Sequence, residues 1–247
     1  MTHVLSPQSR GLLCEFARSR LLVAFDYDGT LAPITADPAR AAMRDRTRGL
    51  LGELCNRYPC AVISGRSRED VARFVDGVAL CAVVGNHGAE SPEVDAPGRE
   101  CVAEWRSRLV RDLDGVDGVL IEDKTLSLSV HYRAACDKDA ARQAISRAVA
   151  VLDAVRVVGG KDIVNLVPKG SRHKGFALDE LRRAERCEAA MYVGDDETDE
   201  DVFRMRRALR LFTVRVGVDE SSDAEYFLQT QREVDDFITA LLELRPG

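Results

Sequence analysis

The amino-acid sequence predicts an α/β fold in which a parallel sheet carries helices on both faces and a smaller α+β domain is inserted into the chain. Short apolar runs without alternation predict strands that are buried on both faces. They lie at 21–25, 60–63, 81–84, 189–193 and 211–216. Amphipathic helical patterns at 47–58 and 68–75 separate the first three runs. Such alternation of strands and helices is typical of a parallel sheet.

The middle of the chain has a different pattern. Two helical patterns, at 101–113 and 139–152, are each followed by two strand patterns, at 118–121 and 126–132 and at 155–158 and 163–167. Because the run at 126–132 alternates apolar with polar residues, we expect only one face of that strand to be covered. The repeated helix–strand–strand order predicts an inserted α+β domain. We expect it to comprise residues 96–167, between core segments 1–95 and 168–247.

Composition argues against several classes of partner. The 247 residues have a net charge of −6 at pH 7, which argues against nucleic acid because phosphate backbones select basic surfaces. The longest apolar run, 78–84, is too short to span a bilayer, and the N-terminus lacks the pattern of a secretory signal. Seven cysteines without a C-x-x-C spacing indicate buried, reduced thiols rather than a zinc site. We therefore expect a cytoplasmic protein that binds neither membranes nor nucleic acids.

Two carboxylates follow the first predicted strand. Asp26 and Asp28 are two residues apart as this strand ends, and Gly29 permits a sharp turn there. In open α/β sheets, ligands bind at the carboxyl ends of the strands, so the two side chains are candidates for a shared site. An acidic surface turn is the alternative.

A second acidic stretch, 194–201, follows the strand predicted at 189–193 and contains six acidic residues. Asp195 and Asp199 are the candidate ligands of Mg²⁺, which prefers oxygen ligands and commonly binds carboxylates together with substrate phosphate. An exposed acidic helix start, favoured by the helix dipole, is the interpretation for Glu200 and Asp201. A calcium-binding module is disfavoured, because Glu200 occupies the position that an EF-hand loop reserves for glycine.

Two weaker signals complete the pattern. Ser64 and the backbone N–H groups beside it suit a phosphate oxygen at the end of the strand 60–63. Lys174 begins a predicted helix, where a cation is unfavourable unless an anion lies beside it. A plain turn and a surface lysine are the respective alternatives.

Taken in order, D-Y-D-G-T-L at 26–31, S-G-R at 64–66, K-G at 174–175 and G-D-D-E-T-D at 194–199 resemble the four motifs of the haloacid dehalogenase-like (HAD) phosphohydrolases. The stretches G-N-H-G-A-E at 85–90 and S-V-H-Y-R at 129–133 are similar to the trehalose-6-phosphate phosphatase family within that superfamily. The resemblance runs from about residue 20 to the C-terminus. It implies a Rossmann-like HAD core with a parallel sheet, an inserted C2-type cap domain, Mg²⁺, and a phosphatase of trehalose biosynthesis.

The resemblance also implies a role for each matched residue. Asp26 corresponds to the nucleophile that becomes an aspartyl-phosphate, and Asp28 to the general acid and base. Ser64 and Lys174 correspond to the phosphate-binding catalytic residues. The metal ligands correspond to Asp26, the backbone carbonyl of Asp28, and Asp195. Asp199 corresponds to a residue that contacts these ligands rather than the metal itself. The substrate-binding candidates are Gly65, Arg66, Asn86 and His87 near the core strands, and Glu122, Lys124, His131, Arg133 and Asn165 in the cap.

One departure concerns the cap. The family usually has a glutamate in a G-K-x-V-x-E-x-x-P strand, where it contacts sugar hydroxyls, and this chain reads G-K-D-I-V-N-L-V-P at 160–168. Asn165 replaces that acid, and an amide keeps hydrogen-bonding capacity without the charge. The resemblance implies trehalose 6-phosphate as substrate. The loss of this acid counts against it and makes a related disaccharide or pseudo-disaccharide phosphate, as in aminocyclitol biosynthesis, the alternative.

Two other functions fit the same motifs less well. A phosphomutase shares the aspartyl-phosphate but returns the phosphoryl group to a sugar. A non-catalytic sugar-phosphate sensor is disfavoured, because every matched catalytic acid is present. We expect a monomer that acts on a small sugar phosphate, with a glycosyltransferase (synthase) as a functional partner.

Overall fold

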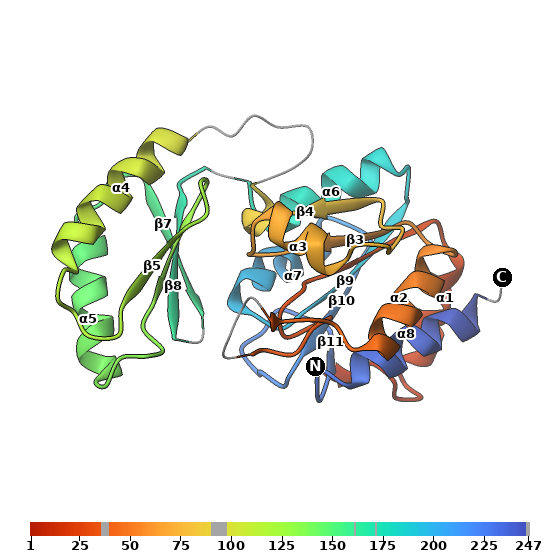
Figure 1. Cartoon of the computed structure of the whole chain (residues 1–247). Helices are drawn as coiled ribbons and strands as arrows, with labels where there is room; N and C mark the ends of the chain where they lie inside the picture. Colours follow the sequence, from red (N-terminus) through yellow and green to blue (C-terminus); the bar gives the residue numbers. More distant parts are fainter. Residues whose placement is uncertain (36–39, 90–97, 161, 171, 246–247) are drawn as a thin grey trace. The chain divides into compact units, whose positions relative to one another are not determined.

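The structure is a computed structural model, which describes all residues except 36–39, 90–97, 161, 171 and 246–247. Internal contacts divide the chain into two compact units. The core unit comprises Met1–Ser91 and His173–Gly247, and the cap unit comprises Pro92–Arg172. The first junction between them falls where residues lie outside the described part of the chain. Figure 1 shows the elements of each unit along the chain.

The core unit contains a seven-stranded parallel sheet, and the five predicted apolar runs supply five of its strands. Its order is β1-β11-β10-β9-β2-β3-β4, and all of its pairings are parallel. The strands are β1 Thr2–His3, β2 Leu21–Phe25, β3 Cys60–Ile63, β4 Ala82–Val84, β9 Ala189–Gly194, β10 Leu211–Val216 and β11 Tyr226–Leu228. Chain order reverses direction at β2, with β3 on one side and β9 on the other. Ligands of open α/β folds bind at such a switch point.

Helices cover both faces of this sheet. One apolar core joins one sheet face to the first three helices and the last one, and a second core joins the other face to α6 and α7. The helices are α1 Arg10–Arg18, α2 Asp45–Cys55, α3 Arg68–Phe74, α6 Lys174–Ala184, α7 Glu200–Phe203 and α8 Glu233–Leu244. In the described part of the chain, 3₁₀ helices accompany them at η2 Asn86–Gly88, η3 Glu197–Asp199 and η4 Arg204–Arg207.

The cap unit is an α+β layer of helices on one antiparallel sheet. Its elements are α4 Arg99–Asp112, β5 Leu120–Asp123, β6 Leu128–His131, α5 Lys138–Val149, β7 Val155–Gly160 and β8 Ile163–Pro168. The sheet order is β5-β6-β8-β7. One apolar core joins α4 and α5 to alternate residues of β6, including Leu128 and Val130. Ser129 and His131 therefore lie on the opposite face. The expectation that only one face of this strand is covered is wrong in part, because Ser127 and Ser129 are buried as well.

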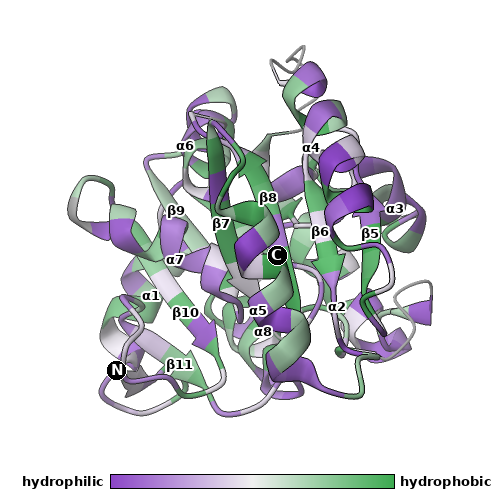
Figure 2. Ribbon diagram, turned by 90° about the vertical axis from the view of Figure 1, so that its left-hand side faces the viewer, coloured by the Kyte–Doolittle hydropathy of each residue, from purple (hydrophilic) through white to green (hydrophobic). Residues whose placement is uncertain are grey.

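The hydropathy colouring separates these layers. In Figure 2 the strands of both sheets are mostly green, whereas α4 is mostly purple. Helix α4 buries only Val102, Trp105 and Leu109, which are spaced three or four apart and form one stripe. Among the described residues, every helix is too short or too polar to cross a lipid bilayer.

The expectation about cysteines is wrong in part. All seven thiols are free, and Cys60 and Cys187 are buried as expected, but Cys81 and Cys136 are exposed. Cys81 precedes the edge strand β4 and Cys136 lies in a loop of the cap unit. The position beside an edge strand leaves Cys81 open to solvent, so an apolar sequence neighbourhood did not ensure burial.

Candidate active site

Three neighbouring strands of the core sheet end in the residues singled out from the sequence. Asp26 follows β2, Ser64 follows β3 and Asp195 follows β9, and β2 pairs with both of the other strands. Because all three strands are parallel, their carboxyl ends meet at one edge of the sheet. Asp26 and Ser64 are buried. The fold therefore brings together side chains that are far apart in the sequence.

A buried lysine lies at the centre of this edge. Lys174 begins α6 and is only 1% exposed. Its Nζ atom lies 2.8 Å from Asp199 Oδ1 and 3.1 Å from Asp26 Oδ1. These two carboxylates neutralise the cation that the helix N-terminus would otherwise disfavour. The anion that the sequence predicts beside Lys174 is thus supplied, at least in part, by the protein itself.

Asp199 holds the Lys174 ammonium group in position. Its Oδ1 accepts hydrogen bonds from Lys174 Nζ and, at 2.7 Å, from the hydroxyl of Tyr192, and its Oδ2 accepts one at 2.9 Å from the backbone N–H of Asp196. Both oxygens are therefore occupied by protein donors. Gly194 allows this arrangement, because a Cβ at that position would overlap the Asp199 carboxylate.

The carboxylates of Asp26, Asp195 and Asp199 converge on one point. One oxygen from each lies within 4.8 Å of the others. Thr30 donates a 3.1 Å hydrogen bond to Asp195 Oδ1. Gly29 has a φ of +80°, and a Cβ there would overlap the Asp195 carboxylate. The turn after β2 must therefore be glycine for Asp195 to approach Asp26.

Burial and mutual repulsion disturb the protonation of this cluster. Burial raises the pKa of Asp26 to about 8, although the Lys174 ammonium opposes the shift. Burial, together with the charges of Asp26 and Asp199, also raises the pKa of Asp195 well above its usual value. Burial alone would lower the pKa of Lys174, but the carboxylates of Asp199 and Asp26 outweigh it and raise that pKa. Full ionisation of the three carboxylates would exceed the charge of the one ammonium group, so protonation or a further cation is favoured.

The donor set fits a hard divalent cation. All three converging groups are carboxylates, and oxygen is the ligand that Mg²⁺ prefers. Asp26 Oδ1 accepts no hydrogen bond from the described residues, so it keeps lone pairs for a ligand besides its ion pair with Lys174. Asp26 and Asp195 are the carboxylates best placed to bind such a cation, because Asp199 is committed to protein donors.

Asp28 has a different environment. Arg66 Nε lies 2.6 Å from Asp28 Oδ2, and Arg66 Nη2 lies 2.7 Å from Asp28 Oδ1. The arginine proposed from sequence to bind substrate therefore forms a two-pronged ion pair with the predicted acid and base. Burial tends to lower the pKa of Arg66, but the hydrogen bonds and charge of Asp28 raise it overall.

The predicted substrate residues Asn86 and His87 lie in η2, directly after β4. Both are buried and have positive φ values of 49° and 57°, which are uncommon outside glycine. The backbone N–H of Asn86 donates to Arg66 O and that of His87 to Ser64 O. The His87 ring packs against Gly65 so closely that a Cβ on Gly65 would overlap it. These contacts hold the loop at residues 64–66 against η2.

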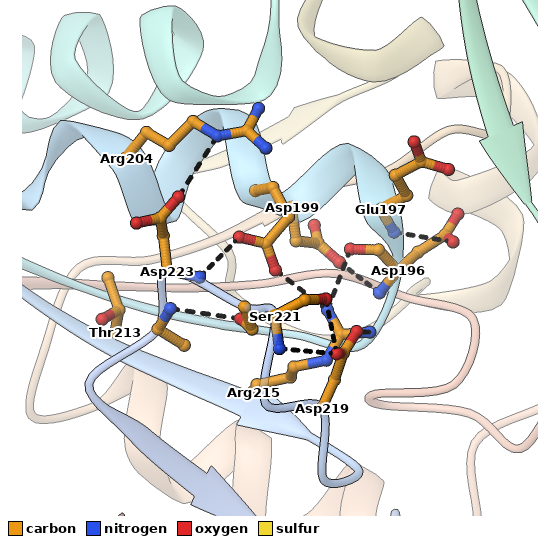
Figure 3. A network of polar contacts seen from close by, with 12 residues as sticks. Asp196, Glu197, Asp199, Arg204, Thr213, Arg215, Asp219, Ser221 and Asp223 are labelled. Atoms are coloured by element: carbon orange, nitrogen blue, oxygen red, sulfur yellow. Dashed lines mark hydrogen bonds and ion pairs between the residues drawn. The ribbon is translucent and has the colours of Figure 1, made fainter. Parts of the chain in front are cut away.

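Glu200 corrects the interpretation of the acidic stretch. It is buried rather than exposed, and its carboxylate accepts hydrogen bonds from Arg215 Nη1 at 3.2 Å and from the backbone N–H of Asp223 at 2.9 Å. Figure 3 shows Arg215 beside Asp196 and Asp219 in this network. Arg215 sits within the apolar run of β10, so sequence pattern alone did not mark it as a partner of the acidic turn.

The five cap candidates belong to the cap unit. Glu122 on β5 accepts a 2.8 Å hydrogen bond from His131 Nε2 on β6, and Lys124 Nζ lies 3.8 Å from the same carboxylate. Asn165 on β8 pairs with Ser129 on β6, and the Ser129 hydroxyl donates to Asn165 Oδ1 at 2.7 Å. Arg133 is exposed in the turn after β6. Glu122, Lys124 and His131 thus form one polar group in the cap unit, and Asn165 forms a second one with Ser129.

Comparisons with known proteins agree with this geometry. The sequence profile described as Trehalose-phosphatase matches residues 24–232. Probable trehalose-phosphate phosphatase 4 of Oryza sativa subsp. japonica is 30% identical over 248 residues, covering 92% of this chain and 67% of the relative. Trehalose-phosphate phosphatase of Mycolicibacterium paratuberculosis is 34% identical over 218 residues, covering 82% of this chain and 56% of the relative.

A solved structure supports the fold independently. The C-terminal domain of C. albicans trehalose-6-phosphate phosphatase superimposes with a TM-score of 0.79, covering 99% of this chain and 98% of that chain at 24% identity. The expected Rossmann-like core with an inserted α+β cap is thereby confirmed. Since the profile spans most of the residues and includes every core side chain discussed above, the chain belongs to the trehalose-phosphatase family, whose named members are phosphoric monoester hydrolases.

Proposed function

We propose that this chain hydrolyses trehalose 6-phosphate to trehalose and inorganic phosphate through a phosphoryl group carried on Asp26. The buried ion pair of Lys174 with Asp26, 3.1 Å apart, is the observation that carries the proposal. A carboxylate nucleophile and a phosphate repel each other, and a fixed ammonium group between them offsets that repulsion without reorganisation. The relatives named above as trehalose-phosphate phosphatases support this substrate.

Two steps complete the reaction. In the first, an Asp26 oxygen attacks phosphorus, the bond from phosphorus to the sugar oxygen breaks, and Asp28 gives its proton to that oxygen. In the second, water attacks phosphorus and Asp28 takes a proton from it, while the bond from Asp26 to phosphorus breaks. Both carboxyl groups return to their starting state. The side chain of Asp28 is 35% exposed, so water can reach it.

Asp26, Asp195 and the backbone carbonyl of Asp28 are the groups that would hold Mg²⁺. Bound there, the cation would supply positive charge beside the transferring phosphoryl group. Asp199 keeps Lys174 in place. Ser64, whose Oγ already accepts a 3.2 Å hydrogen bond from the backbone N–H of Arg66, would donate its hydroxyl hydrogen to a phosphate oxygen.

The cap sheet favours a second candidate substrate. Asn165 uses Oδ1 to accept the Ser129 hydroxyl, so its NH₂ group remains to donate to the substrate. A glutamate there would accept hydrogen bonds from sugar hydroxyls, whereas this amide offers a donor. A related disaccharide or pseudo-disaccharide phosphate is therefore the alternative to trehalose 6-phosphate, with Glu122, Lys124, His131 and Arg133 as further sugar-binding candidates.

Release of inorganic phosphate from a panel of sugar and pseudo-sugar phosphates tests the proposal. We expect release from trehalose 6-phosphate or a close analogue, loss of activity after chelation, and its return with Mg²⁺. Conversion of the substrate into an isomeric phosphate without release would indicate a phosphomutase instead. Stoichiometric binding without conversion of any panel member would indicate a sensor.

A further inference from the structure

We propose that Arg66 is a positioning residue, which fixes the carboxylate of Asp28 in the orientation that both proton transfers need. This inference rests on the role of Asp28 in the proposed function. The observation behind it is the two-pronged ion pair, with N–O distances of 2.6 and 2.7 Å. Such paired hydrogen bonds fix both the position and the plane of a carboxylate.

Arg66 is itself held on several sides. Its guanidinium carbon lies 5.1 Å from the ring centroid of Phe74 and 5.9 Å from that of Tyr27. These two rings stack on each other at 5.4 Å, and the phenol of Tyr27 is anchored by a 2.8 Å hydrogen bond to Ala41 O. The arginine side chain is only 13% exposed. A cation stacked on aromatic faces loses little further freedom when it binds a carboxylate.

The backbone of Arg66 is equally constrained. Its N–H donates to Ser64 Oγ at 3.2 Å, and its C=O accepts from the N–H of Asn86 at 2.7 Å. Arg66 therefore connects the loop after β3 to the turn after β2. Asp28 is 35% exposed at its side chain, so without this clamp solvent would allow it several rotamers.

This geometry assigns Arg66 to Asp28 rather than to the substrate. Two guanidinium nitrogens point at the Asp28 oxygens, while Lys174 already supplies a cation beside Asp26. Each carboxylate oxygen has a second lone pair, so Asp28 can be clamped and still reach the leaving oxygen or the water. Small displacements of a catalytic group can cost about 100-fold in rate, which sets the size of the expected effect.

The decisive variant is Arg66→Lys, because a lysine keeps the charge but cannot form the planar fork. We expect kcat on the sugar phosphate to fall about 100-fold, with KM changed less than about twofold. Arg182→Lys is the matched control. Arg182 also donates from two guanidinium nitrogens to one carboxylate, both to Asp179 Oδ1, with 19% of its side chain exposed and near the C-terminal end of α6. The Arg182→Lys variant should keep the wild-type kcat and KM.

An aryl phosphate substrate allows the burst of phenolate and the later turnover to be measured separately. A purely structural role of Arg66 would not change one of them without the other. Its phenolate leaves without a proton, so Arg66→Lys should retain the first burst of phenolate and slow only the turnover that follows, when Asp28 must activate water. If the wild type does not accept the aryl phosphate, the kcat and KM split on the sugar phosphate decides alone. Phe74→Leu, which weakens the stacking and leaves the fork intact, should lower kcat in the same direction by a smaller factor.

A raised KM with unchanged kcat would assign Arg66 to the substrate and overturn the inference. Equal losses in the burst and in turnover, or wild-type behaviour of Arg66→Lys, would also overturn it. If Arg66→Lys does not fold, Phe74→Leu decides by the same criteria. A wild-type enzyme that releases no phosphate from any sugar phosphate would instead refute the proposed function, so the two failures can be told apart.

Discussion

The charged edge of the core sheet and the Glu122–His131 pair of the cap sheet differ in how far their groups are removed from water. At the core edge, the side chains of Lys174, Asp26 and Asp199 are 1%, 7% and 0% exposed. On the cap sheet, those of Glu122 and His131 are 43% and 28% exposed. Desolvated charges interact strongly, whereas partly solvated ones are screened.

This contrast suggests that the core groups determine the rate of the reaction and that the cap groups determine which sugar is preferred. Core groups are ionisable side chains buried in a low-dielectric site, so replacing one of them should affect the rate over several orders of magnitude. Cap groups offer neutral or screened hydrogen bonds, so replacing one should mainly change which sugar is preferred.

The largest effect is expected for Asp26→Asn. The amide nearly matches the carboxylate in shape but is a poor nucleophile, so kcat should fall more than about 10⁴-fold. Circular dichroism and phosphate release measured together would show a folded, inactive protein. Asp139→Asn, at an exposed position on α5, is the matched control and should retain full activity. Appreciable turnover by the Asp26 variant would exclude covalent catalysis by this residue.

Lys174→Met should affect both activity and stability. Removing the cation leaves buried carboxylates without compensation, so the free energy of unfolding should fall by about 3–5 kcal/mol. Urea denaturation would measure this. The double variant Lys174→Met with Asp199→Asn removes a neighbouring charge as well, and it should recover part of the lost stability. Equal stabilities of the single and double variants would contradict the assigned charge pairing.

Magnesium should stabilise the protein more strongly as pH rises. The pKa of Asp26 is about 8 when folded, above its unfolded value near 3.8. Its protonation therefore stabilises the fold fully below that lower value, and the contribution is lost as pH rises towards about 8. Because Mg²⁺ needs ionised carboxylates, the magnesium-induced rise in Tm should be about 3 °C larger at about pH 8 than at about pH 6.

Thermal unfolding with and without Mg²⁺ across this range checks the prediction. Asp195→Asn is the informative variant, since it removes a ligand and one source of repulsion together. It should unfold at a slightly higher temperature without metal and gain little from Mg²⁺. A magnesium effect that is constant with pH, or that survives in Asp195→Asn, would contradict the proposed ligand set.

The smallest effect is expected in the cap. Asn165→Glu restores an acid on β8 beside Ser129, so the ratio of kcat/KM between trehalose 6-phosphate and its analogues should shift about tenfold. The kcat on the preferred substrate should change much less. Asn165→Asp, which carries the charge on a shorter side chain, separates charge from reach. An unchanged ratio in both variants would remove this position from substrate recognition.

Much of the fold could be predicted because the strands are continuous apolar runs. The bounds of β2, β3 and β10 agree with prediction to the residue, and the ends of the cap elements lie within three residues of the predicted ones. Helix α8 was missed, although Val234, Phe237, Ile238 and Leu241 have helical spacing. Strand β11 has only three residues and gives too short a signal for any periodicity.

The site was predictable in its residues but not in its pairings. Motif order and strand ends indicated Asp26, Ser64, Lys174 and Asp195. The ion pair between Asp28 and Arg66 depends on how two loops direct their side chains, which sequence spacing does not encode. The burial of Glu200 depends in the same way on Arg215, a charged residue within a strand. Local pattern predicts where groups lie, and tertiary packing decides which groups meet.

Transfer of the phosphoryl group to Asp26 is the central claim, and acid quenching during turnover tests it most directly. Wild-type protein stopped in the steady state with saturating sugar phosphate and Mg²⁺ should carry a phosphoryl group on the peptide that contains Asp26, identified by mass spectrometry. The signal should disappear in Asp26→Asn and after chelation. Rapid phosphate release with no modified Asp26 at any quench time would contradict the account.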